Sequence, residues 1–501
     1  MQPVPPDVLS RLDLEGATCR EASAEEPLIP SSPGTSELNE RAPEFASWLA
    51  GQLQAGLTPC RGLVVAVAKP ETGSRPVALW GFAERVTFRA LTDLLMAEAK
   101  HEVDRSTEGY RTFAYAPLAY AQTRGSRVDA NGNSELSWPD NAVVQYVVKA
   151  DLASFYDYVD HDILARELLL RTGDYATIEC LLELLLEVQR RRYGLPQLLE
   201  PSDRLSDLYA SRVLRALRRK QWAAWRFNDD FRIATDTFED AKRALDDLAA
   251  AARDNGLTLN ESKTRTPSFR AYWEKNEVPE YADDDDDSDP QWALDILNST
   301  VTPRDLATDM VTDNRINLHE ADRAAIRAIR SALIRLSDPA EPRAVDVMPK
   351  VMNIVAFAAS TTPYVLRYLK AMANLDRPAV TRTVTAIATE VSLSDWQRLY
   401  LLRAIRELGL LDSDPFTAWI MANRAQRYEP VVRAEAALAL AYANKIEAQE
   451  IVRALDEEPS ALATWYLVAL RRLRHHGAVS QEANDAVRDE SGLHATILAQ
   501  P

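Results

Sequence analysis

The chain has 501 residues and a formal net charge of −17, with 75 acidic against 58 basic side chains. This length allows two or three domains. No basic tail or basic domain is visible in this acidic chain, so any contact with nucleic-acid phosphates has to come from a local groove. No run of eighteen apolar residues occurs, and the N-terminus has no basic and apolar leader, which predicts a cytoplasmic protein without a membrane partner.

The first 43 residues are rich in Pro, Ser and Glu, which predicts an extended arm with room for one short helix. Residues 62–82, GLVVAVAKPETGSRPVALWGF, predict a β-hairpin, because two apolar runs flank a turn at Pro70–Ser74. Lys69 and Arg75 would project from its tip, and the simplest interpretation of such a tip is a solvated one. Apolar periodicity then predicts a helix over residues 85–103.

Three carboxylates stand at the ends of two predicted strands. A β-branched apolar run at residues 143–148 predicts a buried strand that ends at Asp151, and Phe155 and Tyr156 follow before a turn into a helix near His161. Further on, the stretch WRFNDDFRIA places Asp229 and Asp230 between aromatic and β-branched residues. Adjacent carboxylates repel each other unless a cation holds them, so the pattern predicts a cluster that binds two Mg²⁺ ions, with Mn²⁺ as the alternative. A turn capped by the two acids is the simpler interpretation.

Between and after these strands, local signals place further elements. Gly194 and Pro196 in YGLPQ predict a turn, and Ser202 or Asp203 is a suitable N-cap for a helix through Leu217. Residues 239–255 are periodic and end at a glycine, which predicts a helix. A strand over residues 257–260 and the basic stretch ESKTRT, with Lys263, follow.

These stretches together resemble reverse transcriptases. DLASFYDYVDH resembles the first catalytic motif of that family, RFNDDF the second, KPETGSRPVAL with FAERVTFRAL the fingers block, and YGLPQ the substrate-pocket motif. The resemblance covers residues 62–266. It implies an α+β fold over residues 44–272, with fingers and a palm made of an antiparallel sheet backed by helices. Leu198 departs from the pattern, because many relatives have glycine after the glutamine.

The resemblance also implies roles for individual residues. The catalytic and metal-binding residues would be three acids: Asp151, Asp229 and Asp230. The nucleotide-binding residues would be five: Lys69, Arg75, Tyr156, Gln197 and Lys263. Lys69 and Arg75 would bind the incoming triphosphate, Tyr156 would exclude a ribose 2′-hydroxyl, and Gln197 would bond near the sugar. Lys263 would either protonate pyrophosphate or pair with a palm carboxylate.

Beyond this core the composition changes. The run YADDDDDSDP marks a solvated acidic linker, predicted over residues 273–312. Residues 313–501 are rich in Ala, Leu and Arg, with apolar stretches interrupted by Pro or Gly, which predicts an all-α, HEAT-like helical domain. A helical bundle without repeats is the alternative.

A reverse transcriptase core joined to such helices, without a nuclease or maturase motif, resembles the abortive-infection and defence-associated bacterial group. That resemblance implies an RNA-directed or template-independent DNA polymerase in antiphage defence and a homo-oligomer. Its partners would be dNTPs and an RNA template or single-stranded DNA product, the latter covalently attached to a protein hydroxyl. Candidate priming residues are Tyr364, Tyr368, Tyr400 and Tyr442. The alternatives are a retron-like enzyme that uses a dedicated non-coding RNA and a degenerate polymerase that acts as a scaffold.

Overall fold

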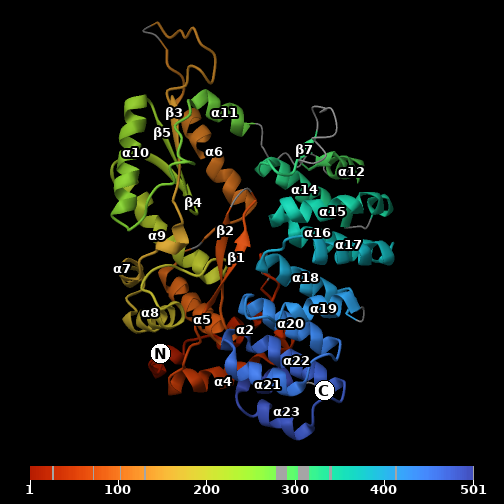
Figure 1. The fold of residues 1–501 in the computed structure, drawn as a ribbon. Coiled ribbons are helices and arrows are strands. Elements are labelled where there is room, and N and C mark those ends of the chain that lie inside the picture. The colour runs from red at the N-terminus through yellow and green to blue at the C-terminus, as the bar shows by residue number, and fades with distance from the viewer. Residues whose placement is uncertain are drawn as a thin grey trace. The chain divides into compact units, whose positions relative to one another are not determined.

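The computed structural model describes residues 1–24, 28–70, 73–101, 103–128, 131–277, 290–302, 315–337, 341–411 and 414–499. The chain, traced in Figure 1, forms two compact units. The first unit comprises residues 1–12 and 87–282, and the second comprises residues 13–86 and 283–501. The four consecutive segments expected from the sequence stay a prediction. The contacts divide the chain differently, because residues 13–86 pack with the C-terminal helices.

A three-stranded antiparallel sheet forms the centre of the first unit, in the order β3-β5-β4. Its strands are β3 (Tyr146–Asp151), β4 (Ala223–Phe227) and β5 (Asp230–Thr235). Val147 pairs with Ala234, and both belong to a buried cluster with side chains of α6 (Thr107–Arg124) and α11 (Phe269–Glu277). Successive residues of a strand face opposite sides, so Val148 and Ile233 point to the other face, where α10 (Phe238–Arg253) contacts β3 and β5. Figure 1 shows α10 and α6 on opposite sides of the sheet. The predicted sheet backed by helices is confirmed.

The remaining helices of the first unit surround one end of this sheet. They are α1 (Pro6–Leu9), η1 (Phe155–Tyr158), α7 (His161–Thr172), α8 (Tyr175–Gln189) and α9 (Glu200–Arg219). The helix expected over residues 85–103 is α5 (Phe82–Ala99), and the division between the units falls within it. The strand expected at residues 257–260 is present only as an isolated bridge between Leu152 and Leu259, and a further bridge joins Lys149 to Arg265 beyond it.

The N-terminal part of the second unit is helical where it is described. It contains α2 (Leu14–Ala22), α3 (Thr35–Glu40) and α4 (Ala42–Ala55), followed by the hairpin strands β1 (Leu63–Ala68) and β2 (Ser74–Leu79). The expected extended arm is therefore wrong. Leu14 and Leu38 are buried, and the Asp13 side chain caps α2 by accepting from the Gly16 amide, so this segment has both an apolar face and a helix start. The hairpin is confirmed, although residues 71 and 72 of its turn lie outside the described range.

The C-terminal part of the second unit is a stack of helices, coloured green to blue in Figure 1. Its elements are α12 (Pro290–Ser299), β6 (Thr300–Val301), β7 (Ile316–Asn317), α14 (Arg323–Ser337), η3 (Pro342–Val347), α15 (Met348–Phe357), η4 (Ala359–Thr361), α16 (Thr362–Met372), α17 (Arg377–Glu390), α18 (Asp395–Glu407), α19 (Asp414–Ala422), α20 (Pro430–Tyr442), α21 (Ala448–Glu457), η5 (Ser460–Leu462), α22 (Ala463–His475), α23 (Gln481–Arg488) and α24 (Gly492–Leu498).

These helices pack in two alternating rows. Contacts run along α12, α14, α16, α18, α20, α22 and α24, and separately along α15, α17 and α19. This arrangement is that of helical repeats, in which each pair buries its apolar stripe against the next pair. The expected helical C-terminal region is confirmed. The acidic run at residues 281–289 lies outside the described residues. Among the helices that the structure describes, none is long and apolar enough to cross a membrane.

Candidate active site

The three predicted catalytic acids meet at one end of the sheet. Asp151 is the last residue of β3 and pairs in register with Asp230, the first residue of β5. Asp229 belongs to the turn before β5, and its carbonyl oxygen accepts a hydrogen bond of 3.0 Å from the Leu152 amide. One carboxylate oxygen from each of the three residues lies within 4.8 Å of the others. Two strands far apart in sequence thus bring three carboxylates into one cluster.

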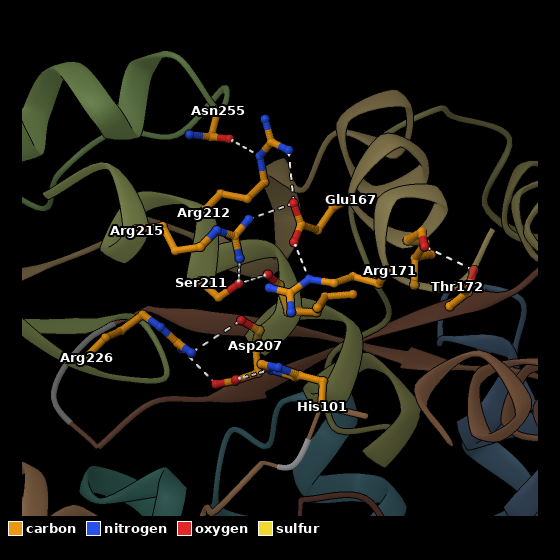
Figure 2. Close-up of polar contacts among 12 residues, drawn as sticks. His101, Glu167, Arg171, Thr172, Asp207, Ser211, Arg212, Arg215, Arg226 and Asn255 are labelled. Atoms are coloured by element: carbon orange, nitrogen blue, oxygen red, sulfur yellow. Dashed lines mark hydrogen bonds and ion pairs between the residues drawn. The ribbon is translucent and has the colours of Figure 1, made fainter. Parts of the chain in front are cut away.

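Contacts with α9 fix the turn that carries Asp229. Its first residue, Asn228, has a φ of 52°, a left-handed conformation that asparagine adopts more readily than most residues. Arg226 donates to the Asn228 carbonyl oxygen at 2.8 Å and forms an ion pair of 2.7 Å with Asp207 of α9. Figure 2 shows Asp207 between Arg226 and His101. The His101 Nε2 atom lies 2.8 Å from the other carboxylate oxygen of Asp207. Burial raises the pKa of Asp207, but the bonds from His101 and Arg226 outweigh it and lower that pKa to about 2.

The cluster holds more negative charge than its surroundings offset. Burial, together with the charges of Asp151 and Asp230, raises the pKa of Asp229 to about 6. Burial also raises the pKa of Asp230, although Arg232 at 3.4 Å opposes that rise. Among the described residues, ion pairs reach Asp151 and Asp230 but not Asp229. Carboxylates in this state are stabilised either by a proton or by a cation.

Asp151 has two partners that follow the predicted palm helix α10. The Lys263 ammonium lies 3.0 Å from a carboxylate oxygen of Asp151, and the side-chain amide of Asn260 donates to the same carboxylate at 3.1 Å. A backbone hydrogen bond joins the same two segments, because the backbone amide of Asn260 donates to the Asp151 carbonyl oxygen at 2.7 Å. Of the two roles considered for Lys263, the structure contains the pairing with a palm carboxylate.

This donor set fits a divalent cation. Mg²⁺ prefers carboxylate oxygens and keeps several waters, so that it is bound by one or two carboxylates and by substrate phosphates. Asp151, Asp229 and Asp230 present such oxygens within one ion's reach, and the raised pKa values of Asp229 and Asp230 indicate charge that a cation would offset.

Tyr156 is fixed by its hydroxyl group. It lies on η1, directly after β3, and its hydroxyl donates to an Asp203 carboxylate oxygen at 2.5 Å. The same hydroxyl accepts from the Arg105 guanidinium at 2.8 Å, and that guanidinium also contacts the Asp203 carboxylate at 3.0 Å. Burial and the neighbouring Asp203 raise the pKa of Tyr156 to about 12. The ring is therefore held in one position next to the strand that carries Asp151.

The YGLPQ turn is attached to the same segment. The Gly194 amide donates to the Val159 carbonyl oxygen at 2.7 Å, and the Leu195 amide donates to the Tyr156 carbonyl oxygen at 2.8 Å. The Gln197 side chain donates to Asp157 at 3.2 Å. Leu198, where relatives have glycine, has a φ of 70°, so the backbone keeps a conformation that glycine adopts more easily. Tyr156 and Gln197 thus lie in adjoining segments of the first unit.

A buried carboxylate joins the helices beneath these segments. Glu167 of α7 contacts the guanidinium groups of Arg171, Arg212 and Arg215 at 3.1, 3.2 and 2.7 Å (Figure 2). Arg212 also donates to the Asn255 side chain at 2.7 Å, just after α10. This network ties α7 and α9 to the end of α10, and it supports the site without belonging to it.

Lys69 and Arg75 belong to the second unit. They flank the turn of the β1–β2 hairpin, and both line a cavity of about 290 Å³ together with residues of α14 and α16. Their predicted contact with the incoming triphosphate stays a prediction.

The four candidate priming tyrosines differ in access. Tyr368 is fully buried, and its hydroxyl donates to the Ala344 carbonyl oxygen. Tyr364, Tyr400 and Tyr442 are partly exposed. Tyr442 lies between the guanidinium groups of Arg406 and Arg472, at 5.2 and 4.8 Å from its ring centre. Burial therefore removes Tyr368 from the candidates.

One local expectation is wrong. The helix expected to have Ser202 or Asp203 as its N-cap begins at Glu200 with Leu199 as N-cap, because Pro201 is favourable in the first turn of a helix.

Sequence reasoning also missed Arg105, Asp203 and Asn260 as partners of the site. Each acts across a long separation in the chain, about 50 residues for Arg105 and Tyr156 and about 110 for Asn260 and Asp151, so no local pattern marks it.

Comparison with known proteins assigns the domain. Residues 68–284 match the model of the family described as reverse transcriptase (RNA-dependent DNA polymerase). No curated protein matches the chain. Among solved structures, apo telomerase from Candida tropicalis is similar at 12% identity and a TM-score of 0.32, over 82% of this chain and 69% of that one. Telomerase from Candida albicans with a fragment of telomeric RNA is similar at 10% identity and a TM-score of 0.28, over 84% and 68%. The family match therefore places a reverse transcriptase domain at residues 68–284 of this chain.

Proposed function

We propose that the protein is a DNA polymerase that joins deoxynucleotides at the cluster of Asp151, Asp229 and Asp230. The single observation that carries the proposal is the convergence of these three carboxylates within 4.8 Å in a domain that matches reverse transcriptases. Two Mg²⁺ ions bound there would activate the attacking hydroxyl and neutralise the leaving pyrophosphate. Asp151 and Asp229 would hold both ions, with Asp230 as an outer ligand.

The remaining residues of the site position the nucleotide in this proposal. The Tyr156 ring, fixed by Asp203 and Arg105, would meet a ribose 2′-hydroxyl and so select deoxynucleotides. Gln197 would bond near the sugar. Lys263, which lies 3.0 Å from Asp151, is a cation available to the leaving pyrophosphate once a metal ion takes over its carboxylate.

The experiment that tests the proposal compares two variants of the purified protein. Asp229→Asn combined with Asp230→Asn should abolish dNTP incorporation, because the cluster loses the charge that binds divalent ions. Asp246→Asn removes an exposed carboxylate from α10 and should keep full activity. Full incorporation by the double variant would remove the polymerase proposal, and loss of activity in both variants would remove the assignment to the cluster.

The proposed biological role is antiphage defence of the abortive-infection type, with DNA synthesis primed by a protein hydroxyl and with a homo-oligomer as the active form. What supports it is the combination of a reverse transcriptase domain with a stack of C-terminal helices, together with the resemblance of the motifs. Tyr364, Tyr400 and Tyr442 are the remaining tyrosine candidates for the primer. Sequencing the nucleic acid that survives nuclease and protease treatment of the purified protein would distinguish untemplated products from copies of a dedicated RNA.

A further inference from the structure

Arg232 is a buried cation beside the carboxylate cluster. It lies on β5 two residues after Asp230, and because alternate residues of a strand face the same side, both side chains point to the face covered by α6 and α11. Only 5% of Arg232 is exposed. Its Nη1 atom lies 3.4 Å from a carboxylate oxygen of Asp230, and within the described ranges this is the only carboxylate with which it forms an ion pair. A buried charge needs such a partner.

The surroundings of Arg232 hold its guanidinium in one place. Nη1 donates to the Phe231 carbonyl oxygen at 2.9 Å, and the guanidinium carbon lies 4.9 Å from the centre of the Phe113 ring on α6. Burial raises the pKa of Tyr272 on α11 to about 12, and the positive charge of Arg232 opposes that rise, as a cation close to this hydroxyl does. The Arg232 Nε atom is buried without a hydrogen-bond partner among the described residues. An apolar side chain would fill this position without leaving a buried donor unpaired, so what the guanidinium adds is its charge beside Asp230.

The two cations that pair with the cluster differ in their access to solvent. The side chain of Lys263, which pairs with Asp151, is 45% exposed, whereas the side chain of Arg232 is 6% exposed. A half-exposed lysine can turn into solvent and free Asp151 for a divalent ion. A buried guanidinium packed against a ring has no such alternative, so Asp230 keeps its positive partner when the other acids are released.

We propose that Arg232 is a positioning residue, the fixed counter-ion that holds the Asp230 carboxylate as an outer ligand and leaves Asp151 and Asp229 to hold the divalent ions. Its effect on DNA synthesis rests on the proposed polymerase function, whereas its effect on cation binding does not. A fixed positive charge beside the cluster weakens the binding of any divalent ion and restrains the third carboxylate. A variant without that charge should therefore bind the ion more tightly and synthesise DNA more slowly. A residue that served packing alone would not change these two quantities in opposite directions.

The test measures Mn²⁺ binding to the full-length protein by calorimetry, without nucleotide, and dNTP incorporation in a separate assay. Arg232→Met removes the charge and keeps a long side chain. It should bind Mn²⁺ at the cluster at least about tenfold more tightly than the wild type, equivalent to about 1.4 kcal/mol. Its kcat should fall by at least about tenfold with little change in the KM for dNTP. Arg232→Lys keeps the charge and should keep the Mn²⁺ affinity of the wild type.

Two control variants accompany this comparison. Arg243→Met removes an exposed arginine of α10 that pairs with Asp240, outside the cluster, and should change neither Mn²⁺ affinity nor kcat. The variant that combines Asp229→Asn with Asp230→Asn reports the Mn²⁺ bound elsewhere on this acidic chain, which is subtracted. Circular dichroism monitors folding, and Arg232→Gln replaces Arg232→Met if that variant unfolds.

The outcomes separate this inference from the polymerase proposal. If the wild type incorporates no dNTP but Arg232→Met binds Mn²⁺ more tightly, the counter-ion role stands and the polymerase proposal fails. Equal Mn²⁺ affinities of Arg232→Met and Arg243→Met would overturn the counter-ion role. Weaker Mn²⁺ binding by Arg232→Met, together with a lower melting temperature, would assign Arg232 to packing alone. Tighter Mn²⁺ binding with an unchanged kcat would overturn the positioning of Asp230.

Discussion

Replacing Asp229 by asparagine is expected to stabilise the protein near neutral pH when divalent ions are absent. Burial and the charges of Asp151 and Asp230 raise the pKa of Asp229 to about 6, against 3.8 for the unperturbed group. The folded protein therefore binds more protons at this site than the unfolded chain between about pH 4 and about pH 6. As the pH rises through that window, the free energy of unfolding of the wild type falls, and it stays lower above it.

The size of the effect follows from the pKa difference. About two units at 1.36 kcal/mol each correspond to about 3 kcal/mol, as an upper limit. The asparagine side chain of the Asp229→Asn variant is neutral at every pH, so the variant escapes this loss. For a unit of roughly 200 residues, a change of 1 kcal/mol shifts the melting temperature by about 2–4 °C. The variant should therefore melt about 6–12 °C higher than the wild type at about pH 7.5 in EDTA, and the difference should shrink toward about pH 5.

Differential scanning calorimetry at both pH values measures this shift. Asp247→Asn is the control of opposite sign, because hydrogen bonds from Lys220 and Trp222 lower the pKa of Asp247, and its loss should not stabilise the protein. Adding Mg²⁺ should raise the melting temperature of the wild type more than that of the Asp229→Asn variant, since the ion binds the folded cluster. Equal melting temperatures at about pH 7.5, or an advantage that persists unchanged at about pH 5, would refute the charge imbalance inferred at this cluster.

Three further predictions concern selectivity, stability and priming. Tyr156→Ala should admit ribonucleotides, whereas Tyr156→Phe keeps the ring and should keep the preference for deoxynucleotides, although it loses the hydrogen bond to Asp203 at a cost of about 2 kcal/mol. Competition between dNTP and NTP incorporation measures the sugar preference. An equal preference in the two variants would contradict the steric role of the ring. Glu167→Gln should lower the free energy of unfolding, measured in urea, by about 3–5 kcal/mol, because it leaves three guanidinium groups around a buried neutral side chain. An unchanged urea midpoint would show that the network does not stabilise the protein. Newly made DNA should stay attached to protein after boiling in detergent and should be released by protease, and free DNA at that step would exclude priming by a protein hydroxyl.

Much of the local structure could be predicted from short patterns. The two apolar runs on either side of residues 70–74 predicted the hairpin of β1 and β2, and Asp160 before His161 marks the start of α7. The helical C-terminal region also follows from its composition, because periodic apolar stripes bury only against other helices. The acids at the ends of β3 and β5 were predictable because carboxylates that end buried strands are rarely placed there for packing.

Where local preferences compete, the sequence was a weaker guide. The N-terminal segment has the Pro-rich composition of an extended arm, yet its apolar residues, such as Leu14 and Leu38, find a core on neighbouring helices and fold there. At α9, Ser202 and Asp203 are both good caps, but Pro201 fits the first turn and moves the helix start to Glu200. Packing and backbone geometry decided these cases.

The sequence by itself determined most of the elements and which strands end in carboxylates, because apolar runs and helix periodicity depend on neighbouring residues. Only the tertiary structure decided the partners of those residues. Lys263 and Asn260 reach Asp151, Arg105 and Asp203 fix Tyr156, and the arginines of α14 share a cavity with Lys69. Each of these contacts joins segments that are distant in the chain. The sequence around a charged side chain contains no pattern that identifies its distant partner, so only the folded chain defines these pairs.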